Sequence, residues 1–455
     1  MKAGSIERIL SVNAGLVCAL ALYACGSSGS GPGAASAGAA ASTGGSASGG
    51  RADSAGGSGG SGAAGAPGSS GNASSGGAAG AAGNGAVGGG VTGGSGALGG
   101  AGGGANGGSL PPLSVSGSEL RANGKKVILR GSSLIDLGAL YVAGNNNLAG
   151  ITTRIDKLAA AGVQGHVVRL PVYPKLDYNG GYPYCSGLPY PVGTGPTSTC
   201  TPTAPMTAAD YYSKVLKPAV DYATSKNLYV IIDFHQIDDV TTGSGADAKA
   251  STSAADALTF WTDIAPKFAS YSNVLFEVFN EPIDTGRSIA WAQLKPVVQG
   301  WVDVIRKSAS NVIIVPSISW DQHPGDAASD PPTGGNLMYT AHIYPNNWNA
   351  GFKAQMATAA AKAPIFLSEW GYVWQSSNSS DALNTSDPSW GSSSASQAGS
   401  FQSSIDGYGA SWTAWVTDNS WAPAMFADDS LTTLTDFGSQ VKAWLSTKAA
   451  SDWVQ

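Results

Sequence analysis

Two stretches of the chain decide its fold, VLFEVFNEP at residues 274–282 and PIFLSEWG at residues 364–371. Each begins as an apolar run rich in β-branched or aromatic residues, which is typical of a strand buried on both faces of a parallel sheet. Each run leads to a glutamate, Glu281 in the first and Glu369 in the second. Because an unpaired buried carboxylate is costly, two such glutamates far apart in sequence predict one acidic site assembled by a closed parallel barrel.

Strand and helix patterns alternate through the rest of the folded part. The expected strands lie at 127–131, 163–170, 228–234, 274–279, 312–316, 338–343, 365–367 and 412–416, and the expected helices at 151–161, 208–225, 254–270, 290–307, 353–363, 396–405 and 436–445. This alternation predicts a parallel sheet. Since no Gly-x-Gly-x-x-Gly fingerprint follows the first strand, it favours a (β/α)₈ barrel over a dinucleotide-binding sheet.

A β-hairpin is expected in front of the barrel. Apolar and polar residues alternate at 113–117 and 127–131, on either side of a turn at Asn123-Gly124. An Asn-Gly pair between two such runs is a strong hairpin signal. We expect the second arm to lead into the first barrel strand.

The amino terminus, residues 1–24, is expected to be an export signal. Lys2 and Arg8 precede an apolar stretch that is too short for a membrane span. The sequence LYACG at 22–26 resembles a bacterial lipobox, in which cleavage exposes a cysteine that receives a lipid. We therefore expect an exported lipoprotein anchored through Cys25, at the cell surface or outer membrane, with ordinary secretion as the alternative.

Residues 25–109 consist almost wholly of Gly, Ala and Ser. Such a segment has too little apolar surface to offset its chain entropy, so we expect a disordered linker. As a coil of about 80 residues it would span roughly 50 Å, enough to hold a domain clear of a surface.

Residues 110–455 have an ordinary globular composition and a length suited to a single elaborated barrel. We expect a monomeric catalytic domain here. The formal net charge of −6 argues against nucleic acid as a partner and favours a neutral polymer such as a polysaccharide.

Cys185 and Cys200 are the only cysteine pair in the folded domain. In an exported protein they are expected to form a disulfide. A metal or redox site, the alternative, would need a nearby histidine or a Cys-x-x-Cys spacing. The acidic residues Asp238, Asp239 and Asp321 could ligate calcium, but no spacing supports this, and we predict no metal and no cofactor.

The remaining polar motifs come at or near the carboxyl ends of the expected strands. They are VRLP at 168–171, DFH at 233–235, NEP at 280–282, AHIY at 341–344, SEWG at 368–371 and Trp415. In this order and rough spacing they resemble glycoside hydrolase family 5, the large cellulase family, over residues 110–445. The resemblance implies a retaining endo-β-1,4-glucanase in which Glu281 is the acid/base and Glu369 the nucleophile.

The physical requirements of that chemistry suggest roles for the neighbouring residues. Retaining hydrolysis needs one protonated and one ionised carboxyl, about 5 to 5.5 Å apart. Arg169 is always cationic and would keep Glu369 ionised. Tyr344 could donate a hydrogen bond to the same carboxylate, and Asn280 could offer its amide to the sugar 2-hydroxyl. His235 and His342 would orient hydroxyl groups or the carboxyl of the acid.

Tryptophans are expected to form the sugar-binding surface, because a flat apolar ring face suits a sugar ring. The first candidate is Trp415 on the last strand. Further candidates follow other strand ends: Trp320, Trp348, Trp374 and Trp421. The sequence VTDN at 416–419 departs from the family, in which an Asp-Lys pair often occurs here.

Three alternatives to the cellulase interpretation remain open at this point. A β-mannanase or another β-glucanase would share the catalytic residues, because loops set the substrate on a common scaffold. A non-catalytic surface carbohydrate-binding protein would keep the barrel alone, although it would not need both Glu281 and Glu369. An adhesive or structural protein displayed on the linker is the third alternative.

Overall fold

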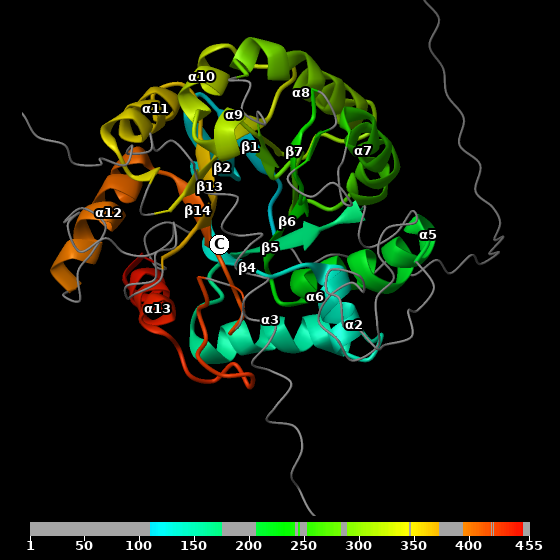
Figure 1. Cartoon of the computed structure of the whole chain (residues 1–455), viewed down its shortest axis with the longest axis vertical. Helices are drawn as coiled ribbons and strands as arrows, with labels where there is room; N and C mark the ends of the chain where they lie inside the picture. The colour runs from blue at the N-terminus through cyan, green and yellow to red at the C-terminus, as the bar shows by residue number, and fades with distance from the viewer. Residues whose placement is uncertain are drawn as a thin grey trace, which may run out of the picture. The chain divides into compact units, whose positions relative to one another are not determined.

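Eight parallel strands close into a barrel, and helices surround them (Figure 1). The computed structural model describes residues 110–174, 206–241, 244–245, 253–283, 289–344, 347–372, 395–419, 421 and 423–448. The barrel strands are β4 (Arg130–Ser133), β5 (Val167–Val172), β6 (Tyr229–Phe234), β9 (Val274–Glu277), β11 (Ile313–Val315), β12 (Leu337–Ile343), β13 (Ile365–Trp370) and β14 (Ser411–Ala414). They neighbour one another in chain order, and β14 pairs with β4 to close the barrel. The predicted (β/α)₈ barrel is confirmed.

Helices occupy every segment in which the sequence predicts one. They are α2 (Leu137–Ala143), α3 (Ala149–Ala161), α5 (Ala208–Tyr211), α6 (Lys217–Ser225), α7 (Ala254–Phe268), α8 (Trp291–Arg306), α9 (Ile318–Asp321), α10 (Pro324–Ser329), α11 (Ala350–Ala360), α12 (Ala395–Tyr408) and α13 (Asp436–Lys448). The predicted helix at 208–225 contains a π-helical turn, η1 (Tyr212–Leu216). Pro218 follows this turn and lacks the N–H that a regular helix needs there, which explains the local widening.

Alternate residues of the barrel strands point into the barrel, and their chemistry changes along its axis. Near the amino ends the inward side chains are apolar and pack in one cluster that includes Val167, Ile231, Leu275, Met338 and Phe366. Two residues further along these strands come Arg169, Asp233, Glu277, Thr340 and Ser368, all of them buried. The barrel interior is therefore apolar at one end and polar toward the carboxyl ends of the strands.

A small antiparallel sheet covers the amino end of the barrel. It consists of β1 (Leu113–Ser116), β2 (Glu119–Ala122) and β3 (Lys125–Lys126). The expected turn at Asn123-Gly124 joins β2 to β3, and both turn residues have positive φ, as a two-residue hairpin turn requires. However, β1 pairs with β2 rather than with 127–131, because the chain already turns back at Gly117, where φ is +59°.

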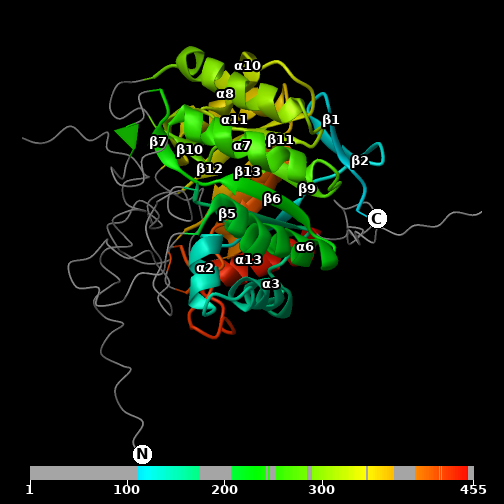
Figure 2. The same ribbon diagram turned by 90° about the vertical axis from the view of Figure 1, so that its right-hand side faces the viewer.

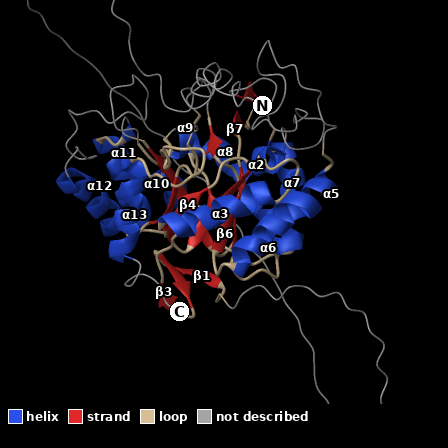
Figure 3. Cartoon of the chain, turned by 90° about the horizontal axis from the view of Figure 1, so that it is seen from below, coloured by secondary structure: helices blue, strands red, loops and turns tan. Residues whose placement is uncertain are grey.

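The opposite end of the barrel carries a second small sheet. Its strands are β7 (Ile237–Asp239), β8 (Ser244–Gly245) and β10 (Glu281–Pro282), with β7 in the middle. Figures 2 and 3 show β7 and the β1–β2 sheet at opposite ends of the molecule. The polar residues at the carboxyl ends of the barrel strands therefore lie at the same end of the barrel as this second sheet.

Several predictions concern residues outside the described ranges. These are the export signal and linker within residues 1–109, the lipid on Cys25, the disulfide between Cys185 and Cys200, and the role of Trp374. They stay predictions. Among the described helices, none combines the length and the apolar character that crossing a membrane requires.

Gly165 provides a test of the barrel packing. Its φ is +64°, and a Cβ there would lie 2.0 Å from the carbonyl oxygen of Arg130. We expect Gly165→Ala to lower the free energy of unfolding by about 3 kcal/mol, from backbone strain and overpacking together. Gly300 in α8 is the control, because a Cβ added to it would have nothing within 4 Å. Gly300→Ala should be neutral or stabilising by about 0.5 kcal/mol in urea titrations. Equal stability of Gly165→Ala and the wild type would contradict this packing.

Candidate active site

The guanidinium of Arg169 lies at the centre of the polar interior. Its Nε and Nη2 donate to the two oxygens of Glu277 at 2.7 and 3.1 Å. It also forms ion pairs with Asp233 at 2.9 Å and with Glu369 at 3.3 Å. Burial lowers the pKa of Arg169, but these three carboxylates outweigh it and raise the pKa above its usual value. Arg169 is therefore a permanent buried cation that links β5 to β6, β9 and β13.

Asp233 connects this cation to His235. Its Oδ2 lies 2.6 Å from His235 Nδ1. Burial lowers the pKa of His235 well below its usual value, and the charge of Arg169 lowers it further. A neutral imidazole therefore lies parallel to the indole of Trp415, with ring centroids 5.3 Å apart and an interplanar angle of 7°. The ring of Tyr173 contacts His235 from another direction, at 4.6 Å.

Glu281 is held by backbone pairing just beyond the barrel. It lies in β10, opposite Ile237 in β7, and its N–H donates to the carbonyl of Gln236. The side chain is 2% exposed. Burial raises the pKa of Glu281 to about 7, and the nearby charge of Glu369 raises it too, against the effect of a hydrogen bond from His342. This carboxyl is therefore suited to carry a proton near neutral pH.

His342, on β12, joins the two ends of the polar cluster. Its Nδ1 lies 2.7 Å from Glu281 Oε1, and its Nε2 lies 3.0 Å from the hydroxyl of Ser368, which donates to Glu277 at 2.6 Å. Burial disfavours the charged ring, but Glu369, Glu277 and Glu281 outweigh burial and raise the pKa of His342 well above its usual value. These surroundings favour an imidazolium, which would donate from both nitrogens.

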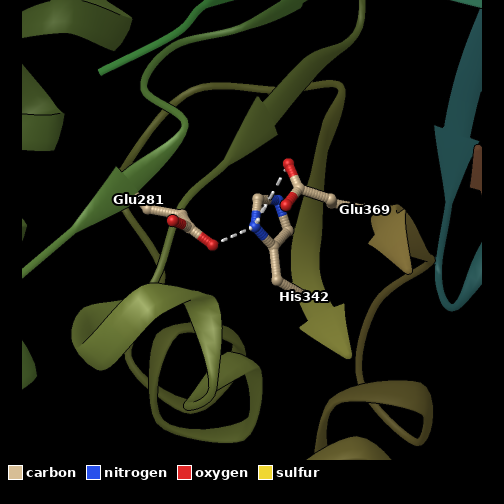
Figure 4. Close-up of side chains that lie close together, drawn as sticks. All are labelled: Glu281, His342 and Glu369. Carbon is tan, nitrogen blue, oxygen red and sulfur yellow. Dashed lines mark hydrogen bonds and ion pairs between the residues drawn. The ribbon is translucent and has the colours of Figure 1, made fainter. Parts of the chain in front are cut away.

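Glu369 faces Glu281 across this histidine (Figure 4). Its Oε1 accepts a 2.5 Å hydrogen bond from the Tyr344 hydroxyl, and its Oε2 accepts a hydrogen bond from Arg169 Nη1. One atom each of Glu281, His342 and Glu369 lie within 4.8 Å of one another. The nearest oxygens of the two carboxyls are therefore closer together than the roughly 6.5 to 9.5 Å that separates the carboxyl groups of inverting glycosidases.

Asn280 presents an oriented amide beside the two glutamates. Its Oδ1 accepts from Arg169 Nη2 at 2.6 Å, which fixes the orientation of the amide group. Its Nδ2 is buried and has no hydrogen-bond partner within the described part of the chain. A buried amide donor without a partner is costly, so this group is a ready donor for a bound hydroxyl.

Glu281, His342 and Glu369 together have the donor atoms to hold a metal ion. A histidine must lose a proton from its nitrogen before that nitrogen can bind a metal. Here the raised pKa of His342 opposes this loss, and Nδ1 is already bonded to Glu281. We therefore interpret these three residues as a proton-transfer site and not as a metal site.

The candidate tryptophans occupy different environments. Trp415 lies beside His235, and Trp421 is half-buried with its ring 6.2 Å from that of Trp415. Trp320 is half-buried in α9. Trp348 is 2% exposed and packs edge-on against Phe401, and Trp415 is 6% exposed. Both rings are thus largely covered by neighbouring residues, and their roles as sugar platforms stay predictions.

The sequence interpretation assigned no role in this site to three buried carboxylates, Asp233, Glu277 and Asp321, although Asp233 stands in the DFH motif at 233–235. Asp233 and Glu277 lie within strands whose other residues are mostly apolar. Residues two apart in a strand point to the same face, so only their spacing from the inward residues Ile231 and Leu275 could have indicated that they point into the barrel. The sequence suggests Asp321 only as a loop residue for calcium, whereas the side chain is fully buried. Its Oδ2 lies 3.6 Å from His342 Nε2.

Comparison with known proteins relates this site to a characterised family. A family model described as cellulase (glycosyl hydrolase family 5) matches residues 120–420. An endoglucanase of Clostridium saccharobutylicum is 30% identical over 233 residues, which are 50% of this chain and 46% of the relative. Endoglucanase 5 of Pectobacterium carotovorum subsp. carotovorum is 31% identical over 231 residues, 49% of this chain and 41% of the relative. The matched region thus spans less than half the length of these relatives.

Solved structures with the same fold include a β-glucanase of Saccharophagus degradans in complex with cellotetraose. It aligns with a TM-score of 0.60 at 21% identity and covers 75% of this chain and 94% of that one. The catalytic domain of a Thermobifida fusca endoglucanase aligns with a TM-score of 0.53 at 22% identity, over 74% of this chain and 97% of that one. At these identities the likeness shows the barrel fold.

The pairing of Glu277 with Arg169 predicts a pH-dependent contribution to stability. Burial opposes ionisation of Glu277, but Arg169 and His342 outweigh burial and lower its pKa from 4.5 to about 2. Ionised Glu277 therefore adds to the free energy of unfolding above pH 4.5. This stabilisation is lost as the pH falls toward about 2. We expect Glu277→Gln to lower the free energy of unfolding by about 3 kcal/mol at pH 7 and the difference from wild type to close at acid pH.

Urea titrations across this pH range measure that difference. Asp303→Asn on the exposed face of α8 is the control, and it should follow the wild type at every pH. A constant difference between wild type and Glu277→Gln from pH 7 down to the acid limit would mean that the ion pair does not supply the stability.

Proposed function

The chain belongs to the cellulase family, glycosyl hydrolase family 5, and from this premise we propose that it is a retaining endo-β-1,4-glucanase. One observation carries the mechanism: the facing carboxyls of Glu281 and Glu369 lie within 4.8 Å, atom to atom. This is shorter than the separation of about 6.5 to 9.5 Å at which inverting enzymes hold their carboxyl groups to admit a water, and it supports a retaining mechanism.

In the first step, Glu369 attacks the anomeric carbon and forms a glycosyl ester, while Glu281 gives its proton to the departing glycosidic oxygen. In the second step, Glu281 takes a proton from water, the water oxygen attacks the same carbon, and the bond to Glu369 breaks. The two glutamates suit these roles because their contacts differ. Arg169 and Tyr344 donate hydrogen bonds to Glu369 and orient its carboxyl for attack, whereas burial favours the protonated form of Glu281.

The neighbouring groups support the same mechanism. The unpaired Nδ2 of Asn280 is available to the sugar 2-hydroxyl, a contact that strengthens in the transition state. Arg169 would fix the position of that amide relative to Glu369, because it donates hydrogen bonds to both side chains. Trp415, backed by His235, would offer its other face to a sugar ring.

A β-1,4-glucan is the proposed substrate class. The matched curated relatives are named endoglucanases, and a related barrel is a β-glucanase in complex with cellotetraose. The chain segments that follow several strand ends, such as 175–205 and 373–394, lie outside the described residues. Because the segments that follow strand ends set the substrate on a common scaffold, mannan and mixed-linkage glucan belong in the same assay.

The first test compares the full chain with two variants on carboxymethylcellulose, mixed-linkage glucan, mannan and xylan. We expect release of reducing sugar from the β-1,4-glucans, and a loss of about 100-fold or more for Glu281→Ala and for Glu369→Ala, because each removes a participating carboxyl. Azide should partly restore Glu369→Ala, where it replaces the nucleophile and gives an α-glycosyl azide. With Glu281→Ala, azide should act only on a substrate with a dinitrophenolate leaving group, where the ester forms without the acid and azide attacks it to give a β-glycosyl azide.

Glu119→Ala is the matched control for this test, because Glu119 lies in β2, in the sheet at the opposite end of the barrel. Its activity should equal that of the wild type. Wild-type rates in either site variant would remove that residue from its role. Binding of glucan by the wild-type chain without release of reducing sugar would favour the non-catalytic alternatives.

The pH dependence of glucan hydrolysis follows from Glu281. Burial, with a contribution from Glu369, raises its pKa to about 7, and only the protonated form can act as the acid. We therefore expect kcat/KM for cello-oligosaccharides to fall as the pH rises through about 7. A substrate with a dinitrophenolate leaving group needs no protonation and should not show this decline. An equal alkaline decline for both substrates would assign it to a group other than the acid.

A further inference from the structure

The segment after β11 adopts an unusual backbone that turns one aspartate into the barrel. Ser319, Trp320 and Asp321 have φ values of 55°, 57° and 58°, all in the left-handed region. Non-glycine residues rarely occupy this region, and a run of three is unfavourable unless the surroundings impose it. Such strain is concentrated at functional sites, so the group that this turn positions is a candidate for a functional role.

The turn positions the side chain of Asp321, which is fully buried. Its Oδ1 accepts a 2.5 Å hydrogen bond from the N–H of Ser317. Its Oδ2 has no hydrogen-bond partner among the described residues. A buried carboxyl oxygen without a partner is costly, and this oxygen lies 3.6 Å from Nε2 of His342.

His342 is the group through which Asp321 could act. On its Nδ1 side lie Glu281 at 2.7 Å and Glu369 at 4.0 Å. On its Nε2 side lie the Ser368 hydroxyl at 3.0 Å, Glu277 at 3.8 Å and Asp321. Glu277 also receives two hydrogen bonds from Arg169. Asp321 is therefore the carboxyl on the Nε2 side that has no other cation as partner among the described residues.

We propose that Asp321 is a positioning residue for the acid/base glutamate, acting through His342: its carboxylate is the counter-ion that keeps the imidazolium in place and its Nδ1–H directed at Glu281. The proposal rests on the proposed function, since it assigns the acid role to Glu281.

The physical consequence concerns the moment at which Glu281 gives up its proton. A carboxylate then forms 2.7 Å from the His342 ring, and a cationic ring stabilises it while a neutral one does so less. Burial raises the pKa of Asp321 well above its usual value and so disfavours its ionised form, and the charge of His342 is the largest influence in the opposite direction. The ionised form of Asp321 therefore depends on the charged ring, and Asp321 adds to the carboxylates that favour that charge.

The first experiment separates an effect on acid catalysis from a general loss of structure. Asp321→Asn keeps an oxygen for the Ser317 N–H but cannot carry the charge. We expect kcat/KM to fall about tenfold for cellopentaose and to stay within about twofold for 2,4-dinitrophenyl β-cellobioside, whose leaving group needs no proton. Asp330→Asn, at the exposed end of α10, is the charge-matched control and should leave both rates unchanged. An equal fall on both substrates, or no fall on either, would overturn the proposal.

The second experiment does not depend on activity. The chain has 4 histidines, so the ring nitrogens can be followed by NMR in protein labelled at histidine, with His342→Gln to assign the signal. We expect the pKa of His342 to be lower in Asp321→Asn than in the wild type and in Asp330→Asn. An unchanged titration would overturn the coupling. If the wild type hydrolyses none of the glucans, the proposed function fails, and this titration still decides whether Asp321 controls the charge of His342.

Discussion

The buried guanidinium of Arg169 is the group on which the rest of the site depends. It binds carboxylates from β6, β9 and β13, namely Asp233, Glu277 and Glu369, and it also orients the amide of Asn280. Removing one partner from a buried ion pair leaves an uncompensated charge that costs about 3 to 5 kcal/mol. The cation and its carboxylates therefore require one another, and the strand ends that carry them are held in register.

The network also explains how two glutamates at the same end of the barrel acquire different chemistry. Glu277 accepts hydrogen bonds from Nε and Nη2 of Arg169. Glu369 accepts one from Nη1 of the same guanidinium and another from the Tyr344 hydroxyl. Glu281 is hydrogen-bonded to Nδ1 of His342 instead of to the guanidinium. The other ring nitrogen, Nε2, is hydrogen-bonded to Ser368, whose hydroxyl donates to Glu277. Burial then dominates at Glu281 and raises its pKa to about 7. Different surroundings, rather than different residue types, separate the acid from the nucleophile.

Much of this arrangement can be predicted from the chain alone, because its causes are local. Alternating strand and helix patterns predict the barrel, and the barrel brings every strand end to one edge. On that basis Glu281, Glu369, Arg169 and His342 are expected to lie together. Glu277 escapes such a prediction, and Asp233 is noticed only as part of the DFH motif without a role, since the part played by a charged residue within an apolar run is clear only when the inward face of each strand is known. Trp348 follows a strand as expected, yet it packs against Phe401 in the core.

The sequence by itself determined the barrel, the order of its strands and the identity of the two facing glutamates, because residue type and short-range periodicity carry that information. Only the tertiary structure decided which charges meet: Arg169 reaches Glu277 across 108 residues and Glu369 across 200. It also decided that Asp321 turns inward to His342, through a left-handed turn that no local propensity favours. Proton affinities depend on such contacts and on burial, and both exist only once the barrel has closed.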